Sequence, residues 1–293
     1  MAETGINRTT DVDTAEITEV SYLGPSGTFT EQALLTQSDL ASARHRKMFS
    51  ITDALMCAER GETPMSFAAI ENSIEGSVNA TLDVLAFESD LLIQREVVIP
   101  IELHLLGLAG AEVGGIKEVL SYPNAFGQCR EFLHEHFPQA KQTTANSTAE
   151  AAESVASLGD ATRAAIGTRL AGDIHGLSVL WEQVEDHHGN QTRFVAVAKG
   201  RVPAPSGNDK TSVVIFQREN KPGSLLGILQ EFADQSIDLT KLQSRPTKKA
   251  LGQYCFIIDF LGHVDEPHVA QCLEAISTQH ADIKFLGSYP VAG

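Results

Sequence analysis

Polar side chains stand directly beside several apolar runs of this 293-residue sequence, where they could bind an anion or assist a leaving group. The segment "NQTRFVAVAKG" places Thr192 and Arg193 before a run that predicts a buried strand. The segment "AAIENS" places Asn72 and Ser73 at the end of another. Strand ends are where α/β proteins gather their binding residues. The alternative is that these side chains only cap their strands.

A strand-to-helix turn adds backbone donors. In "YLGPSGTFTEQAL" the turn passes through Ser26 and Gly27, and the spacing of Thr28 and Glu31 fits a capping box at a helix start. Amides at a helix N-terminus favour an anion because of their free N–H groups and the helix dipole. Taken alone, this pattern is more often an ordinary turn.

Two further junctions carry similar groups. "SYPNAFGQCREFL" places Ser121 at a strand tip and Gln128 near a helix start, while "STAEAA" gives a second capping box, Ser147 and Glu150. A structural role in capping the helix is enough to explain Ser147 and Glu150. Hydroxyl, amide and backbone donors from the other junctions can converge on one anion pocket, and we expect them to do so.

The order of elements predicts two α/β units of different kinds. From Val20 to about residue 199, short apolar runs alternate with helical patterns, which is typical of a sheet with covering helices. Residues 200–210, "GRVPAPSGNDK", predict a linker. The order then becomes strand, helix, strand, strand, helix, strand, a ferredoxin-like βαββαβ plait. Residues 1–18 are rich in Thr, Asp and Glu and predict a disordered tail.

Composition excludes several classes of partner. Lys plus Arg number 22 against 38 Asp plus Glu, so the formal charge is 22 − 38 = −16, which argues against binding to nucleic acid or an anionic membrane. The sequence begins without the pattern of a signal peptide and has no apolar run of about 18 residues, so we expect a cytoplasmic protein.

Four scattered cysteines without a C-x-x-C spacing predict reduced core residues and no metal site. These are Cys57, Cys129, Cys255 and Cys272. The string Asn190-Gln191-Thr192 fits the N-glycosylation acceptor pattern, which is a coincidence in a cytoplasmic chain.

The motifs "YLGPSGTFTEQA", "IENSIEGSVNATLD", "STAEAA" and "NQTRF" occur in the order and spacing of the prephenate dehydratase family. The C-terminal part resembles an ACT domain, the small regulatory module joined to that enzyme. The resemblance implies an α/β catalytic region of two lobes, like the type II periplasmic binding proteins, with the active site between the lobes. It resembles the monofunctional form, because the segment before Val20 is too short for a chorismate mutase domain.

This resemblance sets the expected domain boundaries. The catalytic domain would span residues 19–199, with lobe one formed by 19–98 and 191–199 and lobe two by 101–178. The ACT domain would follow the linker and span residues 211–290.

In such an enzyme, prephenate loses water and carbon dioxide to give phenylpyruvate in phenylalanine biosynthesis, and no cofactor is needed. The resemblance makes Thr192 the catalytic residue, as a hydrogen-bond donor to the departing hydroxyl. Arg193 we interpret as a positioning salt bridge, with substrate binding as the alternative, since adjacent strand residues face opposite ways. The substrate carboxylates would be held by Ser26, Gly27, Thr28, Asn72, Ser73, Ser121 and Gln128.

The resemblance also implies that L-phenylalanine binds where two ACT domains meet and inhibits the distant cleft, so we expect a homodimer or homotetramer. The effector residues would be Asn220, Pro222, Gly223, Ser224, Leu225, Leu226, Gln243, Ser244, Arg245 and Pro246. Gln243 stands where the family usually has a glutamate, so effector affinity or choice would differ. The alternative is that both segments are ordinary turns of the plait.

Two other functions stay open at this point. An arogenate dehydratase acts on a substrate that differs from prephenate only by an amino group on the side chain. A non-catalytic sensor would capture an aromatic acid and report it through the ACT domain.

Overall fold

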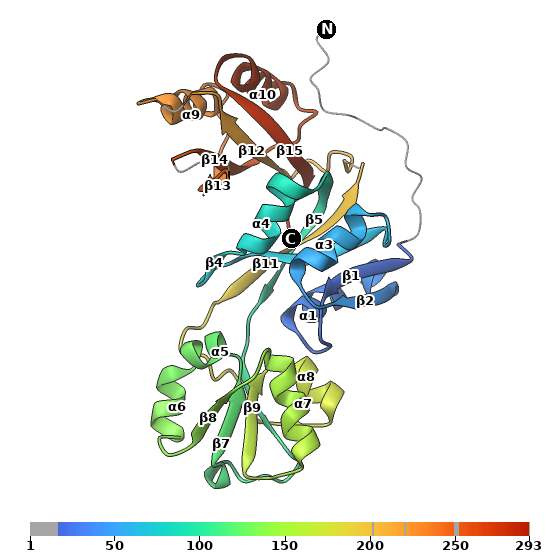
Figure 1. The fold of residues 1–293 in the computed structure, drawn as a ribbon, viewed down its shortest axis with the longest axis vertical. Coiled ribbons are helices and arrows are strands. Elements are labelled where there is room, and N and C mark those ends of the chain that lie inside the picture. Colours follow the sequence, from blue (N-terminus) through green and yellow to red (C-terminus); the bar gives the residue numbers. More distant parts are fainter. Residues whose placement is uncertain (1–16, 201, 220, 249–251, 293) are drawn as a thin grey trace.

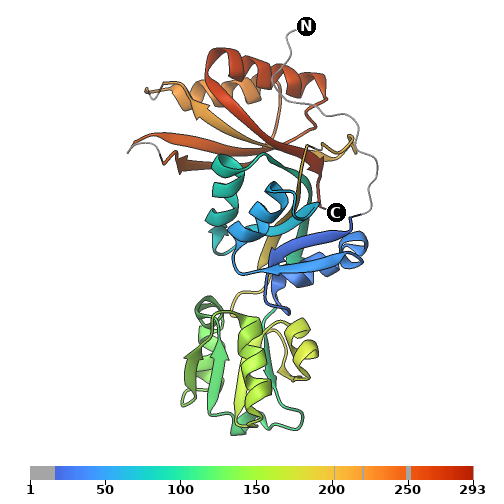
Figure 2. The ribbon, with the colours of Figure 1, turned by 45° about the vertical axis from the view of Figure 1, so that its right-hand side comes forward.

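The structure, a computed structural model, describes residues 17–200, 202–219, 221–248 and 252–292. Three α/β units, each with its own sheet, are stacked along the longest axis of the molecule (Figure 1, Figure 2). The tail expected at 1–18 lies outside the described residues as far as residue 16, and Ile17 packs partly against the core of the middle unit.

The middle unit, lobe one, is a sheet in the order β2-β1-β3-β11-β5, with β4 paired to β3. Its strands are β1 (Glu19–Leu23), β2 (Arg44–Met48), β3 (Met65–Asn72), β4 (Gly76–Ser77), β5 (Leu91–Pro100) and β11 (Gln191–Lys199). Its helices are α1 (Phe29–Leu35), α2 (Ser38–Ala41), α3 (Ile51–Glu59) and α4 (Asn79–Asp83), and a π-helix, Val84–Glu88, continues α4. The buried run 194–198 lies on β11 between β3 and β5, so no edge of it meets water.

Lobe two, at one end of the molecule, is a sheet in the order β10-β6-β9-β7-β8. Its strands are β6 (His104–Gly107), β7 (Glu118–Ser121), β8 (Lys141–Thr144), β9 (Arg163–Gly167) and β10 (Ser178–Trp181). Its helices are α5 (Pro123–Gln128), α6 (Arg130–His136), α7 (Thr148–Leu158), α8 (Arg169–His175) and a 3-10 turn, Val113–Gly115. The N-cap half of the predicted capping box of α7 is present, because Glu150 N donates to Ser147 Oγ over 3.0 Å, while the Glu150 carboxylate accepts from Asn146 N.

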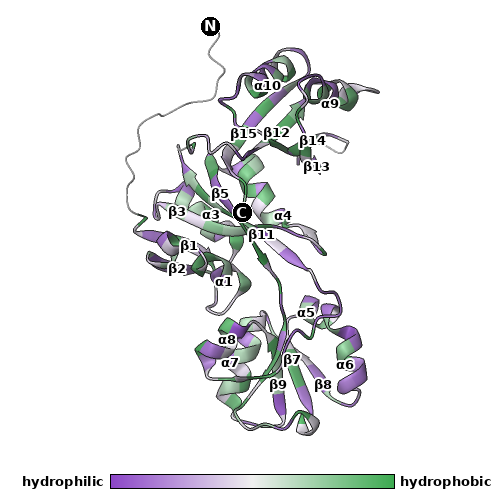
Figure 3. Ribbon diagram, turned by 180° about the vertical axis from the view of Figure 1, so that it is seen from behind, coloured by the Kyte–Doolittle hydropathy of each residue, from purple (hydrophilic) through white to green (hydrophobic). Residues whose placement is uncertain are grey.

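The C-terminal domain is an antiparallel sheet in the order β13-β14-β12-β15. Its strands are β12 (Asp209–Gln217), β13 (Leu239–Pro246), β14 (Tyr254–Leu261) and β15 (Ala281–Pro290), and its helices are α9 (Ser224–Asp234) and α10 (Pro267–Gln279). The predicted βαββαβ plait and the predicted two-lobed α/β region are confirmed. In Figure 3 the helices show both hydrophobic and hydrophilic colour, as expected for elements that bury one face.

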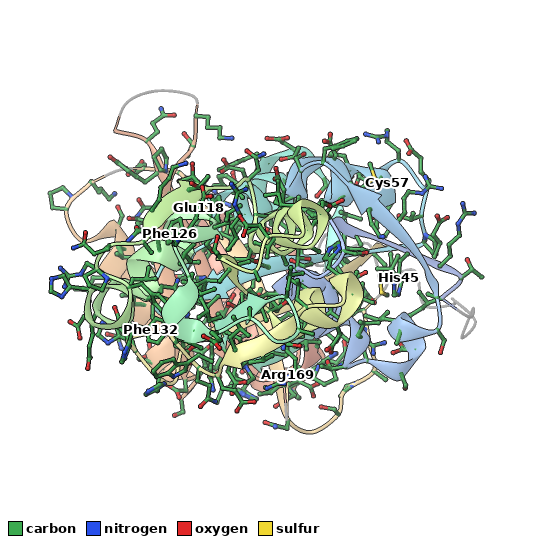
Figure 4. The ribbon with its side chains drawn as sticks, turned by 90° about the horizontal axis from the view of Figure 1, so that it is seen from below. His45, Cys57, Glu118, Phe126, Phe132 and Arg169 are labelled. Atoms are coloured by element: carbon green, nitrogen blue, oxygen red, sulfur yellow. The ribbon has the colours of Figure 1, made fainter. Side chains whose placement is uncertain are left out.

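The chain passes between the lobes twice, and the two passages are joined by backbone hydrogen bonds. Ile101 N donates to Asn190 O over 2.8 Å, and Val184 N donates to Leu103 O over 2.8 Å. Figure 4 views the molecule from the lobe-two end, with Phe126 and Phe132 of this lobe toward one side. Because both passages run together, the chain crosses between the lobes at one narrow junction.

Lobe one and the C-terminal domain share a hydrophobic core. Leu85, Ile93 and Val195 of lobe one lie in one cluster with Ile257 and Leu286 of the C-terminal domain. On β15, a Cβ at Gly287 would lie 2.6 Å from Ile93 O, so this close approach requires glycine. The two units are therefore packed as one body on this side.

The strands run slightly past the boundaries expected from the sequence. β5 continues to Pro100, β10 of lobe two continues to Trp181, and β12 begins at Asp209 inside the expected linker. Among the described residues, no helix has both the length and the apolar character needed to cross a membrane.

Candidate active site

A cluster of amide and hydroxyl side chains lies at the junction between the lobes. Asn72 Nδ2 donates to Thr192 Oγ1 and to Asn190 Oδ1, both over 2.8 Å. Asn190 Nδ2 donates to Gln128 Oε1 of lobe two over 3.2 Å, and Ser73 Oγ donates to Asn190 Oδ1 over 3.2 Å. We call these five residues the junction cluster. Four of them are residues that the sequence predicted as site residues from three distant segments.

The direction of hydrogen bonding in the cluster is set by the backbone. The amides of Ile74 and Glu75 both donate to Asn72 Oδ1 over 2.9 Å, so the NH₂ group of Asn72 must face Thr192. The Thr192 hydroxyl therefore accepts a hydrogen bond from Asn72, and its own proton is available to a further acceptor. A hydroxyl held in this way can donate to a substrate oxygen.

Asn190 is the member of the cluster that the sequence reasoning missed. Its side chain is 3% exposed and is held by partners from both lobes, Asn72 and Gln128. Its position in "NQTRF", directly before the predicted strand, could have indicated a site residue. Sequence reasoning considered Asn190 only as part of a chance glycosylation pattern. A buried polar side chain needs partners, and Asn190 finds them within the site.

Gln128 brings lobe two into the cluster. It is the last residue of α5, and its backbone carbonyl accepts from Asp186 N over 2.7 Å. Its Oε1 accepts from Asn190, so the NH₂ group of Gln128 points away from Asn190. That group lies 3.4 Å from Glu75 Oε1, a long contact that a substrate carboxylate at a shorter distance can replace.

Glu31 of helix α1 accepts hydrogen bonds from most of the donors near the loop that precedes this helix. Glu31 Oε2 accepts from the Gly27 amide over 2.6 Å, and Glu31 Oε1 accepts from Tyr22 over 2.5 Å and from Ser26 over 3.3 Å. Burial, together with the Glu31 carboxylate, raises the pKa of Tyr22, so its hydroxyl remains a donor. The N-cap half of the predicted capping box is present, since Glu31 N donates to Thr28 Oγ1 over 3.3 Å, while the Glu31 carboxylate accepts from the Gly27 amide and not from that of Thr28. The Gly27 amide is thus engaged within the loop.

The same loop contacts lobe two. Thr168 Oγ1, at the start of α8, donates to Gly27 O over 2.6 Å. Gly27 has φ +86°, and a Cβ there would lie 2.9 Å from Ala171 Cα. Only glycine fits both the backbone conformation and the contact. The loop of Ser26, Gly27 and Thr28 is therefore a second contact between the lobes.

Ser121 does not join the junction cluster. It is fully buried, and its hydroxyl donates to Ile166 O on the neighbouring strand over 2.8 Å. Only its position at a strand end suggested a role in binding, and the hydrogen bond inside the lobe-two sheet explains why a hydroxyl is present there.

Arg193 points away from Thr192, toward the C-terminal domain. Its Nε donates to Glu96 Oε2 over 2.6 Å, its Nη1 to Asp259 Oδ2 over 2.5 Å, and its Nη2 to Tyr289 Oη over 2.6 Å. The guanidinium is engaged on the face of the sheet opposite Asn72, which leaves it no route to a substrate at the junction. The interpretation as a positioning salt bridge fits this geometry, and the substrate-binding alternative does not.

The expected effector residues divide between two faces of β13. Gln243 accepts from Ser77 Oγ over 2.6 Å, and Arg245 donates to Asp83 Oδ1 over 2.5 Å, so both contact lobe one. Ser244 and Pro246 alternate with them and are exposed on the other face. Direct contact with an effector on that exposed face is therefore open to Ser244 and Pro246 but not to Gln243 and Arg245.

The other expected effector residues lie at the start of α9. Pro222 and Gly223 are exposed, and Ser224 Oγ donates to Glu219 O over 3.0 Å. Leu226 is 67% exposed, while Leu225 is partly buried against the domain core. Asn220 lies outside the described residues.

A cavity of about 1220 Å³ lies elsewhere, along β5. It is lined by residues of α2, the linker and the C-terminal end, and it includes Glu96 but none of the junction cluster.

The sheet topology and the junction cluster define a two-lobed α/β protein with an appended plait domain, and comparisons with known proteins name the class. The family model of prephenate dehydratase matches residues 20–201, and that of the ACT domain matches residues 212–278. The chain belongs to the prephenate dehydratase family and carries an ACT domain.

Individual relatives agree with this assignment. The prephenate dehydratase of Mycolicibacterium vanbaalenii is 39% identical over 92% of this chain and 90% of its own. The crystal structure of prephenate dehydratase from Arthrobacter aurescens in complex with L-Phe is 38% identical, with a TM-score of 0.85 over 93% of this chain and 90% of that one. A third structure, described as GqqA, a novel type of quorum quenching acylase, is 25% identical, with a TM-score of 0.84 over 94% of this chain and 98% of that one. Because proteins of similar fold can have different activities, the fold alone does not identify the reaction, and the residues of the site have to do so.

Proposed function

We propose that this chain converts prephenate to phenylpyruvate, releasing water and carbon dioxide, and that the reaction takes place at the junction cluster. The observation that carries the proposal is the Thr192 hydroxyl, which accepts from Asn72 over 2.8 Å and keeps its proton for a substrate oxygen. Family membership supports the same reaction.

The reaction needs a donor more than a base. Electrons of the breaking bond to the carboxylate carbon aromatise the ring, while the ring hydroxyl leaves and takes up one proton from solvent to form water. A hydroxyl is a weak acid, so Thr192 stabilises the departing oxygen by a hydrogen bond that strengthens as negative charge develops. Thr192 is only 7% exposed, so this bond forms in a site with little competing water.

Neutral donors would hold the two carboxylates of prephenate. The Gln128 NH₂ group is one, because its contact with Glu75 is long. Thr28, on the loop that forms the other contact between the lobes, is the second, because its hydroxyl accepts from Glu31 N and keeps its proton, whereas Glu31 already accepts from the Gly27 amide and the Ser26 hydroxyl. Ser73 would position the cluster rather than bind substrate, since its hydroxyl donates to Asn190 and accepts from Gln191 N over 2.9 Å.

We further propose that L-phenylalanine inhibits the enzyme by binding the exposed face of β13 and α9 between two copies of the chain. The Arthrobacter aurescens relative was crystallised in complex with L-Phe. On this face Leu226 is 67% and Leu242 is 45% exposed, and a second copy of the chain would cover both. Homodimer or homotetramer, and the cytoplasmic location, stay predictions.

An assay for phenylpyruvate and phenylalanine, with prephenate and arogenate offered separately, tests the reaction. Phenylpyruvate from prephenate supports the proposal, phenylalanine from arogenate alone identifies an arogenate dehydratase, and binding without turnover identifies a sensor. Gly223→Val should abolish inhibition by phenylalanine without abolishing activity, because the new side chain disturbs the start of α9 at a left-handed residue. Unchanged inhibition would place the phenylalanine site elsewhere.

A further inference from the structure

Two neighbouring strands carry the proposed site on one face and the C-terminal domain on the other. In β11, Thr192 belongs to the junction cluster, while the next residue, Arg193, contacts the C-terminal domain. In β3, Asn72 belongs to the cluster, while the preceding residue, Glu71, contacts Lys241 of the C-terminal domain at 3.1 Å. Successive strand residues face opposite sides of a sheet, so both pairs follow the same rule.

The Arg193 contact is buried, and every nitrogen of its guanidinium group has an acceptor. Its side chain is 10% exposed, and those of its partners Glu96 and Asp259 are 2% and 4% exposed. All three nitrogens of the guanidinium group donate, and two of the acceptors, Asp259 and Tyr289, belong to the C-terminal domain. Ser212 completes the arrangement, since its hydroxyl contacts Asp259 Oδ1 and Tyr289 Oη, each over 2.6 Å.

The charges at this interface balance between the domains. Lys210 Nζ lies 2.9 Å from both oxygens of Glu96, and Lys241 lies beside Glu71. The Lys241 ammonium finds no hydrogen bond of good geometry among the described residues, so its contact with Glu71 is an ion pair only. Buried charges are tolerated only while their partners stay in place, so the interface has one preferred arrangement.

We propose that Arg193 is a positioning residue for Thr192 and that Asp259 and Tyr289 of the C-terminal domain hold it in place. The register of β11 on β3 shifts between Arg193 and Phe194, while its pairing with β5 is regular from Gln191 to Ala196, so on the β3 side, where Asn72 lies, strand pairing is interrupted directly after Thr192 and Arg193. The Arg193 side chain, held by three hydrogen bonds, adds a constraint on the β3 side that strand pairing lacks there. The C-terminal domain thereby shapes the dehydratase site even when no effector is bound.

This inference rests on the proposed function and is tested with the full-length protein. Tyr289→Phe keeps the fully buried ring in the core and removes one acceptor of Arg193. Asp259→Asn keeps the shape and removes the charge. Each should lower kcat by about 10- to 100-fold with little change in KM, the size expected when a reacting group is misplaced by a fraction of an ångström to 1 Å.

Two matched variants serve as controls. Tyr254→Phe changes a half-exposed tyrosine of β14, and Asp282→Asn changes an aspartate of β15 that is 72% exposed and pairs with Arg218. Both should keep the parent kcat. Activity is measured well below the thermal midpoint of each variant, which is followed by circular dichroism, so that a loss of stability alone does not lower the rate.

The outcomes separate this inference from the proposed function. If the parent forms no phenylpyruvate, the proposed function is wrong. If the parent is active and Tyr289→Phe and Asp259→Asn are folded and equally active, Arg193 holds the domains together without positioning Thr192, and the inference is overturned. A fall in kcat confined to these two variants supports it.

Discussion

At the scale of single residues, the direction of one hydrogen bond decides the chemistry. Asn72 can only donate to Thr192, because the backbone amides of Ile74 and Glu75 already fix its carbonyl oxygen. Removing the hydroxyl should therefore remove a bond that matters most in the transition state. We expect Thr192→Ala to lower kcat by about 100-fold or more with a smaller effect on KM.

Thr192→Ser is the matched control, since it keeps the hydroxyl and should keep much of the activity. Steady-state kinetics with prephenate measure both variants. An alanine variant as fast as the parent would return Thr192 to the role of a strand cap.

Reversing the direction of the bond gives a sharper test. Asn72→Asp keeps an oxygen for the amides of Ile74 and Glu75 but presents a second acceptor to Thr192, whose proton would then be used inside the protein. We expect a loss of kcat close to that of Thr192→Ala. In the double variant the two losses should not add, because both remove the same donor. Additive losses in this double-mutant cycle would mean that Asn72 and Thr192 act separately.

Gln128 should affect binding instead. Its NH₂ group is proposed to hold a carboxylate in both the ground state and the transition state, so Gln128→Ala should raise KM by about tenfold or more with little change in kcat. A fall in kcat at unchanged KM would instead assign Gln128 to the chemical step.

The sequence predicted much of this site, and its failures have physical reasons. Strand ends pointed to Thr192 and Asn72, and a predicted helix start pointed to Gln128. Ser121 fits the same pattern but satisfies its hydroxyl within its own sheet. The partners of Arg193 lie 66 and 96 residues away in another domain, and no local pattern reports such a contact.

At the scale of elements, the first turn of α1 caps its helix and also holds the preceding strand and loop through Glu31. Its Glu31 is 6% exposed and accepts hydrogen bonds from Tyr22, Ser26 and Gly27. Replacing it with alanine leaves these buried donors without an acceptor, so Glu31→Ala should lower the free energy of unfolding by about 1–3 kcal/mol.

Glu150→Ala is the control, because Glu150 occupies the same position in the more exposed capping box of α7. It should cost about 0.5–1 kcal/mol, and urea denaturation compares the two. Equal losses would show that the contacts of Glu31 beyond the cap add nothing. The sequence predicted both capping boxes because they are local patterns, whereas the contact of Tyr22 with Glu31 depends on the fold.

At the scale of the whole molecule, lobe one and the C-terminal domain do not separate cleanly. Ile93 and Val195 share a core with Ile257 and Leu286, which a chain ending at Pro205 would lack. We expect that shortened chain to bind a hydrophobic dye and to unfold at a lower temperature than the full-length protein. A shortened chain with the parent midpoint and no dye binding would show that the shared core contributes little. Sequence periodicity predicts which face of a strand is apolar, but it does not say which neighbour covers that face.

The position of β11 has a consequence for biosynthesis on the ribosome. β11 separates β3 from β5 in the lobe-one sheet, yet it is synthesised after all of lobe two. The emerging chain therefore presents two unpaired strand edges while the later lobe can already fold, and such edges are prone to aggregate. We expect a chain ending at Gly189 to yield a protease-resistant fragment of lobe two alone. Equal resistance of residues 19–100 would show that lobe one folds before its central strand is made.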